Sequence, residues 1–429
     1  MKEPFIIYNG KKRFLNLPSE INILTFADFK EGKKETDLKQ LLKRAIENPI
    51  KSPKLQDMLS PSDKIAILVE DLTRPSPKRI ILETLLEEIE EKINPPKGNI
   101  SIIIALGTHR KLRENEFKNV FGEKLLSQYS VKNHNCFDAD MVAVSKLNES
   151  RTVKINRQVA EADFKIGIGS ILPHPMNGFG GGAKILFPGV ADFDSIKEHH
   201  LQYTFHKGTA LGRIDGNIFY ERVTSIAKDA KLDFVINTVI SQDDKVSDIV
   251  CGHPLYAHLA GIKMSKDIIS QKFFKKSDLT VITSFPYSEG PQIVKPIIPA
   301  SMITKEKGCI ILVANCTSNL PDPFIDAFSK FHLKYGKSLF KAVKNYFKSN
   351  RLILEDGAID FNMALGLTLA TQDRFKMILV SDDIPKQKAE KMGFIYANNL
   401  DKAFEIGLKV CQGNTLNIVP AGGVILPVI

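Results

Sequence analysis

The sequence lacks the patterns that mark several large classes of protein. It contains only five cysteines in 429 residues and no Cys-x-x-Cys pair, which excludes a disulfide framework or a cysteine-rich zinc site and indicates a reducing compartment. No apolar run approaches the roughly 18 residues that a membrane span needs. The polar start MKEPFIIYNGKKRF is not typical of a signal peptide. These absences predict a cytoplasmic protein without a membrane segment.

Basic residues exceed acidic ones, but no motif for nucleic-acid binding accompanies them. Lys and Arg number 59 against 49 Asp and Glu, a formal net charge of +10. Because there is no dense Lys/Arg run and no RNP-type motif, the excess favours small anionic ligands and argues against nucleic acid as a partner. The composition, 43% hydrophobic and 25% charged, is that of an ordinary globular protein. At about 150 residues per domain, the length predicts two or three domains.

Short apolar runs alternate with amphipathic stretches along the chain, a pattern typical of an α/β fold. One predicted helix follows the first of these runs, where Ile81, Leu85, Ile89 and Ile93 recur at four-residue spacing, and another covers 217–230. The apolar runs predict strands over 65–71, 101–107, 165–172, 232–241, 278–286, 308–316 and 375–383.

A polar segment, SQKFFKKSD, separates two series of predicted strands and helices and puts a domain boundary near 265–277. We therefore expect a first domain over 1–270 and a second α/β domain over 271–412. The tail, 413–429, contains Pro-Ala-Gly-Gly between apolar runs, and we expect it to pack back on the first domain.

Polar residues directly follow three of the predicted strands. Ligands of open α/β sheets bind beyond the carboxyl ends of the strands, so these places are candidate sites. The first is DLTRP, where Asp71, Thr73 and Arg74 could hold an anionic ligand with hydroxyl groups, such as a ribose phosphate. The alternative is that Asp71 or Thr73 caps the following helix, with Pro75 in its first turn.

The second place is GTHR, in which His109 could donate or accept a proton near neutral pH; a structural role is the alternative.

The third place is HPMNGFGGGAK, which begins at His174 and ends at Lys184. Its glycines allow the backbone to approach a bulky ligand closely. Lys184 is a candidate nucleophile or phosphate partner.

Neither of two common nucleotide-binding motifs accounts for this glycine-rich segment. A P-loop is absent, since Lys184 is preceded by alanine and followed by isoleucine. A Rossmann fingerprint is absent because the glycines are contiguous and no acidic residue is suitably placed. The histidines that follow, His199, His200 and His206, would suit Ni²⁺ or Zn²⁺ through an imidazole nitrogen. At most one of the adjacent pair is expected to be a ligand, because neighbouring side chains of a helix point in different directions.

A further candidate pair lies in the second half of the chain. Gln292 and Lys295 are three residues apart in PQIVK and would share one face of a helical turn. They could clamp a carboxylate, or they could simply form an exposed start of a helix.

Taken in order, these segments resemble the lactate racemase family that uses a nickel-pincer nucleotide. The resemblance covers most of the chain and is closest over 65–265. It rests on the segments DLTRPSP, GTHR, HPMNGFGGGAK, PGV with a histidine near 200, LDFVINTVISQDDKVSDIVCGHPLYAHLAGI and QIVK.

The resemblance implies two α/β domains with the active site in the cleft between them, and a first domain that binds the cofactor and carries the catalytic residues. The cofactor would be pyridinium-3,5-bisthiocarboxylic acid mononucleotide, which holds Ni²⁺. Lys184 would link to it covalently through a thioamide. His200 would complete the nickel coordination, with His199 as the competing assignment.

The implied activity is racemisation or epimerisation of a 2-hydroxy acid by hydride transfer to and from this cofactor. His109 and His174 would be the paired acid/base residues. Such a route avoids a carbanion beside a carboxylate, and it needs two bases, a cationic clamp and a rigidly held cofactor. Enzymes that make the cofactor would be partners in maturation. The resemblance implies that Asp71, Thr73 and Arg74 contact the cofactor or the substrate anion. It implies that the substrate is bound by Gln292 and Lys295, which would hold its carboxylate, and by the nearby Tyr287.

The segments on the substrate side depart from the family pattern. GTHR is followed by Lys111, Leu112 and Arg113 rather than by small and polar residues. The segment SFPYSEG also lacks residues similar to the Asp-Asn-Leu-Tyr that commonly precede the glutamine in the family. The chain also has no Trp, which some lactate-specific members place by the substrate. A larger 2-hydroxy acid, such as an aldonic, aromatic or branched one, is therefore the alternative substrate. A non-catalytic protein that carries nickel or the nucleotide is the alternative from another class.

Overall fold

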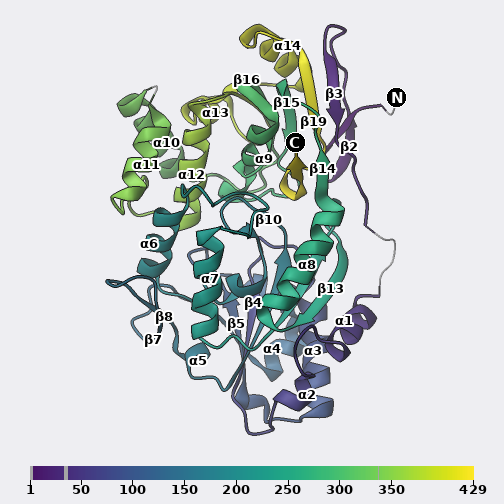
Figure 1. The fold of residues 1–429 in the computed structure, drawn as a ribbon, viewed down its shortest axis with the longest axis vertical. Coiled ribbons are helices and arrows are strands. Elements are labelled where there is room, and N and C mark those ends of the chain that lie inside the picture. Colours follow the sequence, from purple (N-terminus) through teal and green to yellow (C-terminus); the bar gives the residue numbers. More distant parts are fainter. Residues whose placement is uncertain (1–2, 33–36, 337) are drawn as a thin grey trace. The chain divides into compact units, whose positions relative to one another are not determined.

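The computed structural model describes residues 3–32, 37–336 and 338–429. Its contacts divide the chain into two units, each with its own six-stranded sheet flanked by helices (Figure 1). One, which we call the central unit, is Gly32–Ile268. The other, which we call the terminal unit, combines the residues up to Glu31 with Ile269–Ile429. The α/β fold class expected from the sequence is confirmed.

The sheet of the central unit has the strand order β13-β12-β9-β4-β5-β6. Its neighbouring strands are parallel, except that β13 runs antiparallel to β12. All residues of β4 and β9 are buried, as expected for parallel strands covered on both faces, which read as continuous apolar runs. The strands are β4 (Ile65–Glu70), β5 (Ile100–Ala105), β6 (Ser130–Asn133), β9 (Phe164–Ile171), β12 (Phe234–Ile240) and β13 (Val246–Gly252).

Helices and two short hairpins complete the central unit. The helices are α1 (Leu38–Glu47), α2 (Leu55–Met58), α3 (Lys78–Lys92), α4 (Glu114–Gln128), α5 (Arg157–Ala160), α6 (Phe193–Tyr203), α7 (Ile218–Asp229) and α8 (Pro254–Ile269). The hairpins pair β7 (Met141–Lys146) with β8 (Thr152–Asn156), and β10 (Pro173–His174) with β11 (Gly178–Phe179).

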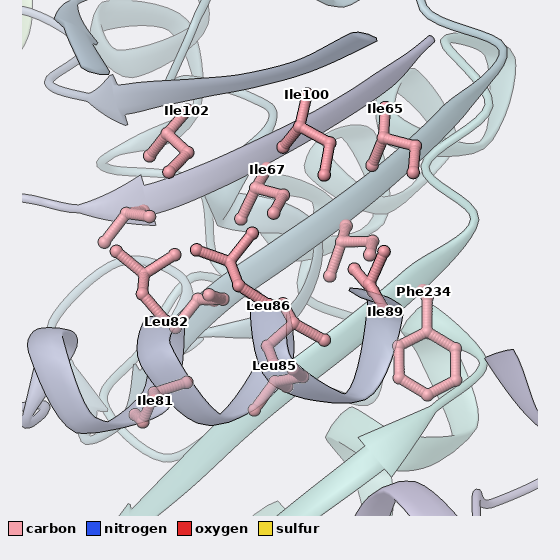
Figure 2. Packing of buried hydrophobic residues seen from close by; sticks show 14 of the residues in the cluster. Ile65, Ile67, Ile81, Leu82, Leu85, Leu86, Ile89, Ile100, Ile102 and Phe234 are labelled. Carbon is pink, nitrogen blue, oxygen red and sulfur yellow. The ribbon is translucent and has the colours of Figure 1, made fainter. Parts of the chain in front are cut away.

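Helix α3 covers one face of this sheet with the apolar stripe that the sequence predicts. Leu85 and Ile89 are fully buried. The side chains opposite them come from alternate positions of β4 and β5, because successive residues of a strand point to opposite faces. Figure 2 shows this cluster, in which Ile81, Leu82, Leu85, Leu86 and Ile89 pack with Ile65, Ile67, Ile100, Ile102 and Phe234.

Truncating Leu85 should strongly destabilise the central unit. Leu85→Ala leaves a cavity between α3 and the sheet, and we expect the free energy of unfolding to fall by about 2–5 kcal/mol. Ile80→Ala on the same helix is the matched control, because Ile80 is 41% exposed and its truncation should cost under about 1 kcal/mol. Urea denaturation of both variants measures the difference, and equal losses would contradict this packing.

The sheet of the terminal unit has the order β18-β17-β16-β15-β19-β3, and all its neighbours are parallel. Its strands are β3 (Asn22–Phe26), β15 (Ser277–Thr283), β16 (Thr304–Val313), β17 (Lys376–Val380), β18 (Ile395–Ala397) and β19 (Thr415–Val419). Two smaller pairings join β1 (Phe5–Tyr8) with β2 (Lys11–Phe14), and β14 (Ser270–Lys272) with β20 (Leu426–Val428).

The helices of this unit are α9 (Ile297–Ile303), α10 (Asp322–Tyr335), α11 (Leu339–Lys348), α12 (Ile359–Gln372), α13 (Lys386–Lys391) and α14 (Leu400–Val410). Helices α10, α11 and α12 gather into a group, drawn in green in Figure 1. Over the described ranges, none of the helices of the chain combines the length and the apolar character that crossing a bilayer requires.

The structure divides the chain differently from the predicted domains. The tail 413–429 forms β19, an interior strand of the terminal sheet between β15 and β3 (Figure 1). Within the expected first domain, 1–270, the tail therefore pairs with Asn22–Phe26, and these residues belong with it to the terminal unit. This pairing joins segments nearly 400 residues apart, from Asn22 to Thr415. The central unit ends at Ile268, close to the boundary expected at 270.

Candidate active site

Three loops of the central unit leave neighbouring parallel strands at one edge of the sheet. β9, β4 and β5 lie next to one another, and the chain continues from them at Leu172, Asp71 and Leu106. The carboxyl ends of parallel strands meet at the same edge, which is where open α/β sheets bind ligands. The three segments that the sequence singled out therefore start close together.

A buried carboxylate joins the first two loops. Asp71 is 6% exposed; its Oδ2 hydrogen-bonds with His109 Nδ1, and its Oδ1 accepts from Thr73 N (3.1 Å) and Thr73 Oγ1 (2.7 Å). Burial by itself would raise the pKa of Asp71, but His109, Arg74 and Thr73 hold that pKa below its ordinary value. An ionised Asp71 fixes the proton of a neutral His109 on Nδ1 and leaves the lone pair on Nε2.

Arg74 is held at the same turn. Its Nη1 donates to Thr73 Oγ1 (2.7 Å) and to Thr73 O (3.2 Å), and Lys78 Nζ donates to Arg74 O (2.6 Å). The alternative that Asp71 or Thr73 caps the next helix is not what the structure shows. Helix α3 begins at Lys78 after Pro77 and has no side-chain cap, so the side chains of Asp71 and Thr73 serve the turn and His109.

His174 lies in the third loop, at the start of the β10–β11 hairpin. It is 7% exposed, and its Nδ1 accepts hydrogen bonds from Met176 N (3.2 Å) and Asn177 N (3.0 Å). Asn177 Nδ2 in turn donates to Phe179 O (2.7 Å), across the hairpin. The backbone of its own turn therefore orients the ring of His174, whereas a carboxylate orients the ring of His109.

Two buried side chains from later in the chain tie down the glycine-rich loop. Gly182 N donates to Asn237 Oδ1 (2.9 Å), and His258 Nε2 donates to Gly180 O (2.8 Å). Gly182 has a φ of +54°, and a Cβ at this position would lie 2.5 Å from His258 Cγ. The backbone at Gly182 thus packs against the His258 ring at a distance and a φ that suit only glycine.

Adding a methyl group to Gly182 should therefore disturb the loop. We expect Gly182→Ala to lower the free energy of unfolding by about 2–4 kcal/mol, since both the φ and the space are unfavourable. Gly98→Ala is the control: nothing lies within 4 Å of a Cβ at Gly98, and the change should stay within about 0.5 kcal/mol. Thermal or urea unfolding compares the two, and a Gly182→Ala variant as stable as the control would contradict the packing.

Lys184 follows this loop, in a short 3₁₀ helix over Gly182–Ile185. The protein surrounds its amine on most sides, and this burial, with the charge of Arg74 added, lowers the pKa of Lys184 to about 7 despite the opposing charge of Asp71. Within the described ranges, no hydrogen bond or ion pair joins Lys184 Nζ to another side chain. A large share of this amine is therefore uncharged, and hence nucleophilic, near neutral pH.

A half-buried lysine with a lowered pKa should cost stability. The pKa of about 7 lies below the ordinary 10.5, so between these values the unfolded chain binds the extra proton and the free energy of unfolding rises with pH. Below about pH 7 both states are protonated and the penalty is complete. We expect Lys184→Met to gain about 1–3 kcal/mol at pH 6, and less toward pH 10. Denaturation at both pH values, with the exposed Lys207→Met as control, tests this; a constant gain or a loss would contradict it.

Helix α6 carries the two adjacent histidines, and it sets them in different surroundings. His200 Nδ1 donates to Ile196 O (2.9 Å), which leaves the lone pair of a neutral ring on Nε2. Burial, and then the charges of Lys184 and His109, lower the pKa of His200 to about 3. His200 is therefore a neutral imidazole in the same surroundings as Lys184, which is the form in which histidine binds a metal.

His199 is fully buried among aromatic rings. Its ring centroid lies 4.3 Å from that of Phe219, 5.1 Å from Phe187 and 5.2 Å from Tyr203. Its Nε2 donates to Phe219 O (3.3 Å), while Nδ1 is buried and has no hydrogen-bond partner among the described residues. The charge of Lys184 acts on both His199 and His200, and that of His109 contributes at His200. The choice of His200 over His199 as the metal ligand stays a prediction. His206 lies beyond α6 in an exposed turn.

The side chains predicted to bind a substrate carboxylate belong to the terminal unit. Gln292 is 5% exposed, and its Oε1 has no hydrogen-bond partner among the described residues. Lys295 follows the 3₁₀ helix Gly290–Val294, and its Nζ lies 4.9 Å from the ring centroid of Tyr287. The alternative of an exposed helix start is wrong for Gln292, which is buried. A role of these residues in binding, and a site in a cleft between domains, stay predictions.

Acidic and sulfur ligands do not add to the candidate metal site. Among the residues that the structure describes, no group of three or more His, Cys, Asp and Glu side chains is arranged to hold a metal ion. A metal at His200 Nε2 would therefore take further ligands from a bound group or from solvent.

Sequence reasoning missed the side chains that support the loops. Asn237 is a polar residue in the middle of the apolar strand β12, and His258 lies on the apolar helix α8; both are 1% exposed. A polar side chain inside an apolar run needs a partner, and this signal could have marked both as supports. Which loop each one binds could not be read from spacing.

Similarity to known proteins extends over the whole chain. The family described as "Lactate racemase N-terminal domain" matches residues 8–212. The lactate racemase of Thermoanaerobacterium thermosaccharolyticum is 27% identical over 425 residues, which are 97% of each chain. The lactate racemase of Lactiplantibacillus plantarum is 31% identical over 280 residues, which are 64% of this chain and 65% of that protein.

Solved structures agree with these matches. The apoprotein of the Thermoanaerobacterium thermosaccharolyticum lactate racemase superposes with a TM-score of 0.88 at 27% identity, and all of both chains is covered. A protein from Thermotoga maritima has a TM-score of 0.65 at 19% identity over 91% of this chain and 97% of its own, which is a similarity of fold alone. With the same fold along its whole length and a matching N-terminal segment, this chain is similar to lactate racemases, which are isomerases.

Proposed function

We propose that this protein racemises lactate or a related 2-hydroxy acid, with a nickel-pincer nucleotide as its cofactor. The observation that carries the proposal is the largely uncharged amine of Lys184. It lies near enough to Asp71 and to His200 for their charges to interact, and Asp71 is hydrogen-bonded to His109. Two relatives bear the name lactate racemase, which supports lactate as the first substrate to test.

The side chains of the site suit the proposed cofactor. Lys184, with a pKa of about 7, is a nucleophile that could form the covalent thioamide link. His200 could offer its Nε2 lone pair to nickel, since its Nδ1–H is engaged with Ile196 O. The glycine-rich loop before Lys184, held by Asn237 and His258, brings bare backbone to the place where a bulky group would attach. When bound, the cofactor would supply the acceptor for the hydride at C2 of the substrate.

The remaining side chains would bind the substrate and handle its hydroxyl proton. We place His109 and His174 at the substrate hydroxyl, because both are histidines on loops that start at the same sheet edge. The ionised Asp71 would orient His109 and stabilise its imidazolium form. Arg74 would pair with an anionic group of the cofactor or substrate, with Thr73 holding its guanidinium in place.

The substrate carboxylate would be bound by Gln292, Lys295 and Tyr287. A cation close to the buried amide of Gln292 suits a carboxylate, and Lys295 is such a cation in the terminal unit, beside the ring of Tyr287. We propose these three residues as the carboxylate-binding group. We also propose maturation by cofactor-making enzymes in the cytoplasm, whose reducing conditions suit the five free cysteines.

The test is a panel of enantiopure 2-hydroxy acids offered to protein loaded with the cofactor. The panel contains lactate together with aldonic, aromatic and branched acids, and chiral chromatography follows the enantiomers. We expect lactate to racemise; a larger acid that racemises faster would correct the substrate and keep the reaction. Protein that carries the cofactor by intact mass yet converts no acid would overturn the proposal and favour a carrier of nickel or nucleotide.

A further inference from the structure

Two buried side chains of opposite charge lie behind the first loop of the candidate site and hold its backbone. Ser76 ends the turn that begins at Asp71. Its backbone N–H donates to Glu70 Oε1 (3.3 Å), and its carbonyl oxygen accepts from Lys78 Nζ (3.4 Å). Lys78 Nζ also donates to Arg74 O (2.6 Å). Glu70 and Lys78 therefore bind the backbone of the turn through both its N–H and its C=O groups.

Glu70 is itself anchored in the central sheet. It is the last residue of β4, and Ser170 of the neighbouring strand β9 donates to it from N to Oε2 (2.7 Å) and from Oγ to Oε1 (2.5 Å). Thr238 of β12 donates from Oγ1 to Ser170 Oγ (3.1 Å). All three side chains are buried. Glu70 thus joins the turn to a hydrogen-bonded network across three adjacent strands.

Lys78 occupies a place that costs free energy. Its side chain is buried, and it is the first residue of α3, where the helix dipole disfavours a cation. Burial lowers the pKa of Lys78, and the charges of Glu70 and Asp71 oppose this shift. Replacing buried charges of opposite sign by neutral side chains of similar volume is often neutral or stabilising. Stability alone therefore does not account for Glu70 and Lys78.

We infer that Glu70 and Lys78 are positioning residues, which hold the turn so that Arg74 presents its guanidinium to a bound anionic mononucleotide. This inference rests on the proposed function, in which Arg74 pairs with an anionic group. Thr73 Oγ1 accepts from Arg74 Nη1 (2.7 Å) and fixes the guanidinium. Because Lys78 fixes the carbonyl oxygen of Arg74, both ends of this residue are constrained before a ligand binds, which lowers the entropic cost of binding.

A double variant, Glu70→Gln with Lys78→Met, tests the hold on the turn in cofactor-free protein. The single amide oxygen of glutamine can accept from Ser170 N or from Ser76 N but not from both, and we expect it to keep the shorter bond, to Ser170. Methionine has no donor for the carbonyl oxygens of the turn. We expect amide hydrogen exchange at Ser76 to become about tenfold or more faster, with little change in melting temperature. Unchanged exchange at Ser76, in this variant and in Glu70→Gln alone, would overturn the inference.

Binding of nicotinic acid mononucleotide measures the consequence for the site. This pyridinium nucleotide carries a phosphate but no thiocarboxyl group, so it occupies a nucleotide site without forming a thioamide with Lys184. We expect the double variant to bind it about tenfold or more weakly than the native protein, by isothermal titration calorimetry. Arg79→Gln with Glu83→Gln removes an exposed ion pair of the same helix (2.9 Å) and is the matched control, which should bind like the native protein. A native protein that binds the nucleotide no better than the double variant would overturn the inference.

The two positioning residues should act through Arg74. Arg74→Ala by itself should weaken nucleotide binding. Adding Glu70→Gln and Lys78→Met to it should then change Kd by less than about twofold, because the guanidinium that they position is already gone. A further loss of about tenfold in the triple variant would show a general effect on the structure of the site and would overturn the positioning role.

These outcomes are distinct from those of the proposed function. If loaded protein racemises no acid while nucleotide binding still depends on Glu70 and Lys78, the proposed function fails and the positioning role stands. If racemisation occurs and the double variant binds the nucleotide as tightly as the native protein, the inference alone fails.

Discussion

Replacing Lys184 with arginine should leave the protein unable to hold the cofactor covalently and should lower its racemase rate by about 10³-fold or more. The reason is the charge state of the side chain. Lys184 has a pKa of about 7, so much of the amine is an uncharged nucleophile at neutral pH. Arginine stays protonated and cannot attack a thioacid. Intact mass after loading and kcat with lactate measure the two effects.

The pH dependence of loading provides a check that does not require turnover. In the native protein the rate of covalent attachment should rise with pH up to about 7 and then level, because Lys184 is already deprotonated above its pKa of about 7. An ordinary lysine, with a pKa near 10.4, would give a rate that keeps climbing toward pH 10. Such a climb would contradict the assignment, as would normal attachment in Lys184→Arg. The exposed Lys207→Arg is the matched control and should load normally.

Asp71→Asn should lower kcat by about 10³–10⁴-fold while cofactor loading stays intact, because the substitution changes the tautomer of His109. Thr73 N and Thr73 Oγ1 both donate to Asp71 Oδ1, so an asparagine here would turn its oxygen toward Thr73. Its amide N–H groups would then face His109 Nδ1 and hold the ring proton on Nε2. A ring in that form cannot accept the hydroxyl proton.

Two measurements distinguish this effect from simple loss of structure. Equal loading by intact mass would show that the site still accepts the cofactor, and ¹⁵N spectra would show the ring proton of His109 moving from Nδ1 to Nε2. Asp138→Asn, an exposed change in the same unit, should leave kcat unaltered. A loaded Asp71→Asn protein that keeps a tenth or more of the native kcat would contradict the role of the Asp71–His109 pair.

The strands that could be predicted from sequence are those buried on both faces. β4 and β9 stand out as apolar runs because every residue of each is buried. Strands with exposed residues do not form such apolar runs. The residues of β3 range from half-buried to exposed, so the sequence gives no clear sign of this strand. Its pairing with β19 depends on contact between the two ends of the chain, which no local pattern records. The sequence therefore predicts that the tail folds back on the first part of the chain, but not which strand it pairs with.

The candidate site was also predictable only in part. The sequence shows that predicted strands are followed by Asp71, His109 and His174, and parallel strands bring such residues to one edge of the sheet. The hydrogen bond between Asp71 and His109 could not be seen, because it depends on the neighbour relation of β4 and β5. The adjacent histidines His199 and His200 look alike in the sequence, and their different hydrogen-bond partners, Phe219 O and Ile196 O, depend on how the chain folds.

The fate of the C2 hydrogen tests the central claim most directly. L-lactate carrying deuterium at C2 is incubated with the loaded protein in ordinary water, and NMR follows the product. Racemisation by hydride transfer predicts D-lactate that retains deuterium at C2, because the C2 hydrogen would then leave and return without exchanging with solvent. D-lactate with ordinary hydrogen at C2, which removal of a proton would produce, or no D-lactate at all, would contradict the account.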